Sequence, residues 1–203
     1  MDFKKHLENA WNSMLKNLVP LLLMTLVMSV LSVVTFGILA PVMLAGYYQS
    51  ILLMLRSGRT PSINDLFSEM RLFLPLLVFS IVIFFATMIG FMLLVVPGIV
   101  VVCLLAFGCL YMLPLMTDKQ MGLVDAVKKS WAMATQGNMA DHIVVVILYL
   151  GLMAIGSSVF IGILFTQPFA TIFVLSVFEE RMAGGPGAAA TPPPPPPMAG
   201  GDA

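Results

Sequence analysis

The sequence predicts an all-α integral membrane helical bundle, with six transmembrane helices in three hairpins, each preceded by a short interfacial amphipathic helix. Composition, the position of the charged residues and a repeated order of segments lead to this prediction. The chain has 203 residues, of which 60% are hydrophobic and 10% are charged. A soluble domain usually carries about 25% charged residues. This chain lacks the charge to cover a water-facing surface, so we expect lipid around most of its length.

The charged residues gather in four clusters: the N-terminus, 56–71, 118–141 and the C-terminus. Between them lie three stretches without Asp, Glu, Lys or Arg, at 17–55, 72–117 and 142–178. One membrane span needs about 20 apolar residues, within a range of roughly 17–25. Each stretch is therefore too long for one span and fits two spans joined by a tight turn.

Proline and glycine mark the turn in each stretch. Gly37 and Pro41 interrupt the first, Pro97 and Gly98 the second, and Pro168 the third. Proline has no backbone N–H and disfavours helix at the residue before it, so these positions are predicted hairpin turns. The six predicted spans are 18–38, 41–56, 72–95, 98–117, 142–163 and 166–180.

The charge distribution also predicts the topology. With two crossings between successive clusters, all ten Lys and Arg residues lie on one side of the membrane. The positive-inside rule assigns that side to the cytoplasm. We therefore expect a multi-pass protein of the plasma (bacterial inner) membrane with both termini cytoplasmic. Hairpins that dip in from the cytoplasmic side without crossing would satisfy the same charges, and this alternative stays open.

A short amphipathic segment precedes each hairpin, because apolar residues recur there at helical spacing. The three apolar faces are Phe3, Leu7, Ala10, Trp11, Met14 and Leu18; Ile63, Leu66, Phe67 and Met70; and Leu123, Val127, Trp131 and Ala134. Aromatic and basic residues on such helices belong at the headgroup level. The predicted interfacial anchors are Trp11, Phe67, Trp131, Lys128 and Lys129.

The three units look like copies of one repeat. Asn9-Ala10-Trp11, Asp65-Leu66-Phe67 and Asp125-Ala126-Val127 occupy corresponding places. The interval from the first of these residues to the turn proline is the same in the first two units and longer in the third. A period near 60 residues predicts a repeated unit of interfacial helix, span, turn and span. In the second unit Ser62 and Asp65 have the spacing of a capping box.

No catalytic, cofactor-binding or metal site is predicted. Cys103 and Cys109 have no histidine nearby, and neither His6 nor His142 has a partner at metal-ligand spacing. Nucleophile-elbow and phosphate-loop motifs are absent from the sequence. His142 is expected in the headgroup layer. The net charge of zero gives no reason to propose nucleic acid as a partner.

The predicted spans contain no Asp, Glu, Lys or Arg, which argues against ion-coupled transport. A pathway lined by backbone groups or hydroxyls stays open, and the candidate hydroxyls are Ser29, Ser32, Thr35, Thr87, Ser157 and Ser158. Hydrogen bonding between helices is the favoured interpretation of these residues. We expect a non-enzymatic protein that organises lipids or partner proteins; the alternative is a transporter or channel for a small or lipidic solute.

The chain divides into a membrane domain at 1–182 and a Gly/Ala/Pro-rich tail at 183–203. The tail runs through six prolines, Pro192 to Pro197, and is predicted to be disordered with a polyproline II stretch. A solvated tail is the favoured interpretation. Docking of a protein partner on the prolines is the alternative.

Several motifs resemble a known group of proteins. They are Val96-Pro97-Gly98-Ile99, Leu113-Pro114-Leu115, Asp125 to Trp131 (DAVKKSW) with Gly137-Asn138, and the Asp65-Leu66-Phe67 segment after Gly58-Arg59. Over about residues 1–180 the chain resembles bacterial membrane proteins related to the membrane domain of glycerophosphodiester phosphodiesterases, and the YciC-like and DUF975-like families. The resemblance implies six spans. No phosphodiesterase domain accompanies them here, so that activity is not implied.

Overall fold

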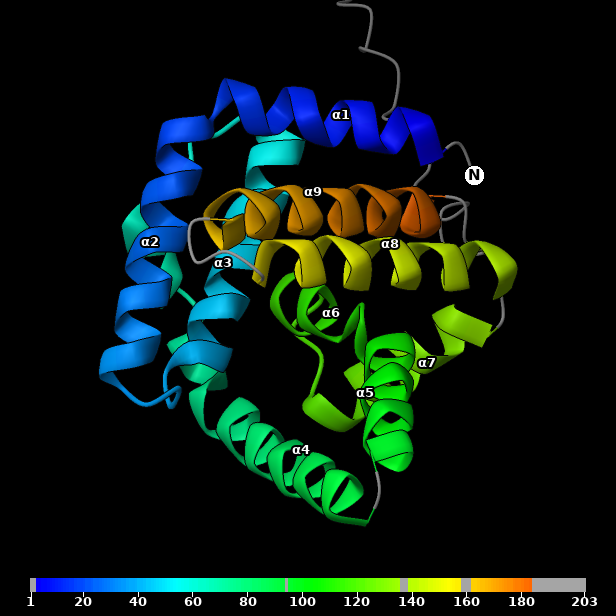
Figure 1. The fold of residues 1–203 in the computed structure, drawn as a ribbon. Helices are drawn as coiled ribbons and strands as arrows, with labels where there is room; N and C mark the ends of the chain where they lie inside the picture. The colour runs from blue at the N-terminus through cyan, green and yellow to red at the C-terminus, as the bar shows by residue number, and fades with distance from the viewer. Residues whose placement is uncertain (1–2, 94, 136–138, 158–161, 184–203) are drawn as a thin grey trace, which may run out of the picture.

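The computed structural model describes residues 3–93, 95–135, 139–157 and 162–183, and within these ranges helices are joined by short turns and loops, with no β-strand (Figure 1). The α-helices are α1 (Phe3–Lys16), α2 (Leu18–Val34), α3 (Ala40–Ser57), α4 (Phe73–Leu93), α5 (Val95–Cys109), α6 (Met112–Asp118), α7 (Leu123–Thr135), α8 (Met139–Ser157) and α9 (Gly162–Ala183). Two 3-10 helices, η1 (Ile63–Phe67) and η2 (Met70–Leu72), join α3 to α4.

Four helical segments are long and apolar enough to cross a membrane: Ile63–Leu93, Val95–Asp118, Met139–Ser157 and Gly162–Ala183. The pair α1 and α2, which meets at a bend of 87°, would make a fifth. The structure therefore confirms an all-helical chain with several membrane-compatible helices. It does not reproduce six separate spans by this measure.

The predicted interfacial segments differ in their local structure. The first and third are the α-helices α1 and α7, but the second forms the two short turns η1 and η2. The predicted capping box is present there, and the Ser62 N–H donates to the Asp65 carboxylate at 3.0 Å. Of the predicted apolar face of this segment only Leu66 is buried, while Ile63, Phe67 and Met70 remain exposed.

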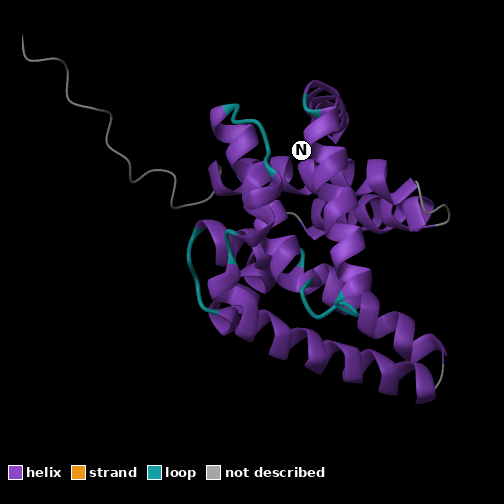
Figure 2. Cartoon of the chain, turned by 90° about the vertical axis from the view of Figure 1, so that its left-hand side faces the viewer, coloured by secondary structure: helices purple, strands orange, loops and turns teal. Residues whose placement is uncertain are grey.

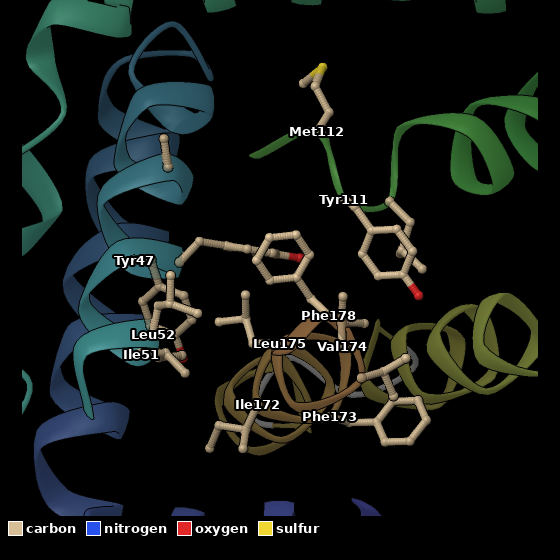
Figure 3. Close-up of a cluster of buried hydrophobic side chains, with 14 of the residues drawn as sticks. Tyr47, Ile51, Leu52, Tyr111, Met112, Ile172, Phe173, Val174, Leu175 and Phe178 are labelled. Atoms are coloured by element: carbon tan, nitrogen blue, oxygen red, sulfur yellow. The ribbon is translucent and has the colours of Figure 1, made fainter. Parts of the chain in front are cut away.

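Helix α9 is the centre of the packed core. Ile172, Phe173, Val174, Leu175, Val177 and Phe178 are all fully buried, so side chains on every side of the helix are covered. Figure 3 shows Leu175 and Phe178 lying between the α3 side chains of Tyr47, Ile51 and Leu52 and the ring of Tyr111, which stands in the break between α5 and α6. In Figure 1, α1, α8 and α9 run across the direction of α2 and α3. The packing thus differs from a simple bundle of parallel hairpins.

The predicted turns are in part displaced. Gly37 has φ +79° and lies in the turn between α2 and α3, and Pro41 lies in the first turn of α3. Pro97 and Gly98, by contrast, lie inside α5, which begins at Val95. Their prediction as turn residues is corrected, because the first turn of a helix tolerates a residue without an N–H.

Pro168 was also predicted at a turn, and this position is wrong. It is a buried residue within α9, six positions after Gly162 begins the helix. Neighbouring helices surround it, and such packing allows a proline to remain inside a membrane helix. The connection between α8 and α9 falls at 158–161, outside the described residues.

The α4–α5 hairpin extends away from the other helices, at the lower right of Figure 2. Only 6% of the most apolar window of the Ile63–Leu93 segment is buried within the protein. The two helices approach closely where glycines face each other, since a Cβ on Gly90 would lie 3.1 Å from the Gly98 Cα. Gly98 therefore permits close helix packing.

Replacement of Gly46 by alanine should destabilise the fold. A Cβ on Gly46 of α3 would lie 2.6 Å from the Leu66 carbonyl oxygen, where η1 packs against this helix. Overpacking of this kind typically costs about 1–3 kcal/mol. Unfolding of the purified protein in mixed detergent and SDS micelles, followed by circular dichroism, would measure the change. The matched control is Gly151→Ala, because a Cβ there meets nothing within 4 Å. Equal stability of the two variants would contradict the packing described.

Candidate functional site

Charged residues from the ends of three helices meet at Arg56, in the last turn of α3. Its Nη2 donates to a Glu179 carboxylate oxygen at 2.6 Å and to an Asp118 oxygen at 3.2 Å. Its Nε also bonds Glu179, and its Nη1 forms an ion pair with Asp118. We call Arg56, Asp118 and Glu179 the Arg56 cluster.

The Arg56 cluster joins elements that are far apart in the sequence. Arg56 lies 62 positions before Asp118 and 123 before Glu179. Both carboxylates stand near the C-terminal end of a helix, where the helix dipole disfavours negative charge. The Asp118 side chain is also only 9% exposed. A guanidinium that bonds both carboxylates offsets these costs, and its forked donors match carboxylate geometry.

Two further contacts tie α9 to its neighbours beside the Arg56 cluster. His6 of α1 bonds the Ser176 hydroxyl at 2.9 Å and pairs with Glu180. Arg181 donates to the Met133 carbonyl of α7 at 2.7 Å. The polar ends of α1, α3, α6, α7 and α9 are thus gathered in one region of the molecule.

A polar cavity of about 520 Å³ opens beside the Arg56 cluster. It lies between α1 and the C-terminal parts of α3 and α9, and its lining is mostly polar or charged. The lining residues are His6, Asn9, Asn12, Ser13, Lys16, Leu55, Arg56, Ser176 and Glu179. The sequence did not predict this cavity. Charged clusters recur about every 60 residues, and this repeat was a signal that helix ends from different repeats could meet.

A second polar feature lies where α5 and α6 are broken at Leu110 and Tyr111. Pro114 cannot donate to the Leu110 carbonyl, which is the cause of the break. The Tyr111 N–H donates instead to the Ser130 hydroxyl at 3.2 Å. The Phe107 carbonyl accepts from His142 Nε2 at 2.8 Å. Side chains of α7 and α8 thus replace the hydrogen bonds that the break removes.

His142 is expected in the headgroup layer, and its membrane depth stays a prediction, while the structure shows the side chain in a packed environment. The side chain is fully buried, with its ring 4.7 Å from the Phe107 ring centroid. Three buried polar atoms nearby have no hydrogen-bond partner within the described parts of the chain: His142 Nδ1, Tyr111 OH and Arg181 Nε. The Arg181 guanidinium also lies 5.6 Å from the Tyr111 ring centroid, as in a cation–π contact.

The hydroxyl groups considered for a pathway are mostly occupied within their own helices. Ser29, Ser32, Thr35 and Ser157 each donate to a backbone carbonyl of the preceding turn. Thr87 lines an apolar groove between α3, α4 and α6, and Ser158 lies outside the described residues. Ser29 lines a small apolar pocket between α2 and the start of α9.

The predicted anchors lie at the surface. Trp11, Phe67 and Trp131 are 51%, 38% and 46% exposed, and Lys128 and Lys129 are exposed beside Trp131. Trp11 also makes an edge-to-face contact with Phe169 at 6.1 Å between ring centroids. Cys103 and Cys109 are free, and the described residues contain no group of three His, Cys, Asp or Glu that could hold a metal ion.

Loss of the Arg56 guanidinium should weaken the packing of α3, α6 and α9. Arg56→Gln leaves Asp118 as a largely buried charge without its main partner, a loss of about 1–3 kcal/mol in the free energy of unfolding. SDS titration of the purified variants would measure it. Because Asp118→Asn removes the stranded charge, the double variant should lose less stability than the sum of the single changes. Strict additivity would show that the two side chains are not coupled.

Comparison with known proteins adds no assignment: no family model, no curated protein and no solved structure matches this chain.

Proposed function

We propose that this chain is a non-enzymatic, multi-pass integral membrane protein that organises lipids or partner proteins at the membrane. The proposal includes six crossings in three hairpins, with the N- and C-termini on the cytoplasmic side of the plasma (bacterial inner) membrane. The observation that carries it is the Arg56 cluster. The resemblance to bacterial multi-pass membrane families supports the same arrangement.

The Arg56 cluster supports the topology because it contains one charged residue from the end of each hairpin. Arg56 closes the first hairpin, Asp118 the second and Glu179 the third. Residues in direct ion pairs must lie at the same depth, and charges avoid the hydrocarbon core. The three hairpin ends therefore belong to one side of the membrane, which requires an even number of crossings between them.

Exposed apolar surface supports lipid as the surrounding medium. On α4, Leu74, Val78, Val82 and Phe85 are between 52% and 67% exposed. Contiguous apolar surface of this extent is typical of a membrane or partner interface. Apolar grooves of about 530 Å³ between α3, α4 and α6, and of about 400 Å³ between α5 and α8, offer acyl chains or partner helices a place to pack.

Helices α2 and α3 are the two proposed spans that fall short on length or apolar character. α2 has 17 residues, the lower end of the range for a span. α3 has 18 residues but contains Tyr47, Tyr48 and Ser50, all buried among other helices. The length of α2 is within the range for one span. Helix α3 is shielded by protein, so it needs less apolar surface than a helix that faces lipid. Both helices are therefore compatible with crossing.

Single-cysteine labelling tests the topology. In a background with Cys103→Ala and Cys109→Ala, Phe36→Cys and Met92→Cys should react with a membrane-impermeant maleimide added outside the cell. Ser57→Cys should react only after the membrane is opened. All three positions are exposed in the structure. If none of them reacts from outside but all react from the cytoplasm, the hairpins are re-entrant and the six crossings are wrong.

The functional class requires a separate experiment. The protein purified in native lipids should retain specific lipids or proteins above the level of a matched multi-pass control, as measured by mass spectrometry. Reconstituted proteoliposomes should show no solute flux above protein-free vesicles. Reproducible flux without retained lipids or partners would instead support a transporter or channel.

A further inference from the structure

We propose that the polar cavity beneath α1 binds the phosphate group of a phospholipid headgroup. The inference rests on the proposed membrane function and names the class of molecule held at this site. The volume of about 520 Å³ lies in the range of roughly 300–1,000 Å³ typical of small-molecule sites. Its polar lining distinguishes it from the apolar grooves on α4 and α8.

The charge of the lining favours an anionic group. Lys16, in the last turn of α1, lines the cavity and has no ion-pair or hydrogen-bond partner among the described residues. The carboxylate that also lines the cavity, Glu179, is bonded to Arg56, and Glu180 pairs with His6. Both carboxylates therefore have partners within the protein, whereas the Lys16 ammonium has none among the described residues and can meet a phosphate oxygen.

Neutral donors stand beside Lys16. Asn9, Asn12 and Ser13 line the same wall, and their side chains make no hydrogen bond to any other residue that the structure describes. Amide and hydroxyl groups donate to phosphate oxygens. Asn9, Ser13 and Lys16 follow each other by four and three positions, so they share one face of α1. The cavity thus presents a cation and several unused donors together.

This cavity lies where a headgroup is expected, because its lining includes the charged residues Lys16, Arg56 and Glu179 and charges avoid the hydrocarbon core. Helices α1 and α2 meet at 87°, directly after Lys16, so α2 leads away from the cavity. The exposed apolar residues of α2 begin with Val19 and continue through Leu23, Leu26 and Val30 at helical spacing, which forms a stripe for an acyl chain. If the cavity held only water, lipid binding would not depend on Lys16.

The test uses the full chain, purified in detergent and titrated with phosphatidylglycerol, with bound lipid counted by native mass spectrometry. Lys16→Gln should weaken binding about tenfold, as expected for one charge-assisted contact. Lys16→Arg should retain binding. Lys4→Gln is the matched control, since Lys4 is an exposed lysine of the same helix that does not line the cavity, and it should leave binding unchanged. Ser13→Leu, which fills the cavity without a change in charge, should also weaken binding.

The outcomes separate the possibilities. Equal loss in Lys16→Gln and Lys4→Gln would mean non-specific attraction and overturn the site, as would unchanged binding in both Lys16→Gln and Ser13→Leu. Competition by soluble glycerol 3-phosphate at concentrations similar to the lipid would support the phosphate site but assign it to a soluble ester. If the wild-type protein retains lipid while these variants are unaffected, this site is wrong and the proposed membrane function stands. Absence of retained lipid in the wild-type protein overturns this site, and the proposed function then stands only if specific partner proteins are retained.

Discussion

The guanidinium of Arg56 holds carboxylates that would otherwise disfavour the packing around them. Asp118 and Glu179 come from helices of different hairpins, and each stands near a helix C-terminus with an unfavourable dipole. Arginine keeps its proton throughout the accessible pH range, so the positive charge of this contact is always present. The polar cavity beneath α1 and the position of α9 both depend on this contact.

The second constraint is the shortage of polar surface, and α9 shows how the protein meets it. Helix α9 has apolar residues on every side and no polar face that could turn toward water. Helices α1, α2, α3 and α8 therefore all pack against it. The charged residues that remain are concentrated at its C-terminal end, where Glu179, Glu180 and Arg181 each find a partner. The core is thus organised around one helix, and the charges are organised around the end of that helix.

The sequence predicted the helical elements well, because the spacing of apolar residues and the positions of charged residues are local signals. The amphipathic segment that became α1 and the turn at Gly37 are examples. Proline was a less reliable guide. Pro97 and Pro168 lie inside helices, because the effect of a missing N–H depends on position in the helix and on neighbouring packing.

The site residues were harder to predict, since they depend on tertiary contacts. Arg56, Asp118 and Glu179 were visible as charges at the ends of spans, but nothing local shows that three such ends meet. The packed environment of His142 was similarly hard to predict, because it is set by the Phe107 carbonyl on another helix. The crossing of α8 and α9 over α2 and α3 is a tertiary outcome of the same kind (Figure 1).

The contact between α1 and α9 has a consequence for synthesis of the protein. His6 meets Ser176 and Glu180 across sequence separations of 170 and 174 residues. Ribosomes add about 5–20 residues per second, so α1 emerges many seconds before its partner exists. During that interval its apolar face has only the membrane surface or a chaperone to cover it. Packing of α1 against α9 is therefore a late step of biogenesis. Only then can the polar contacts between His6, Ser176 and Glu180 form.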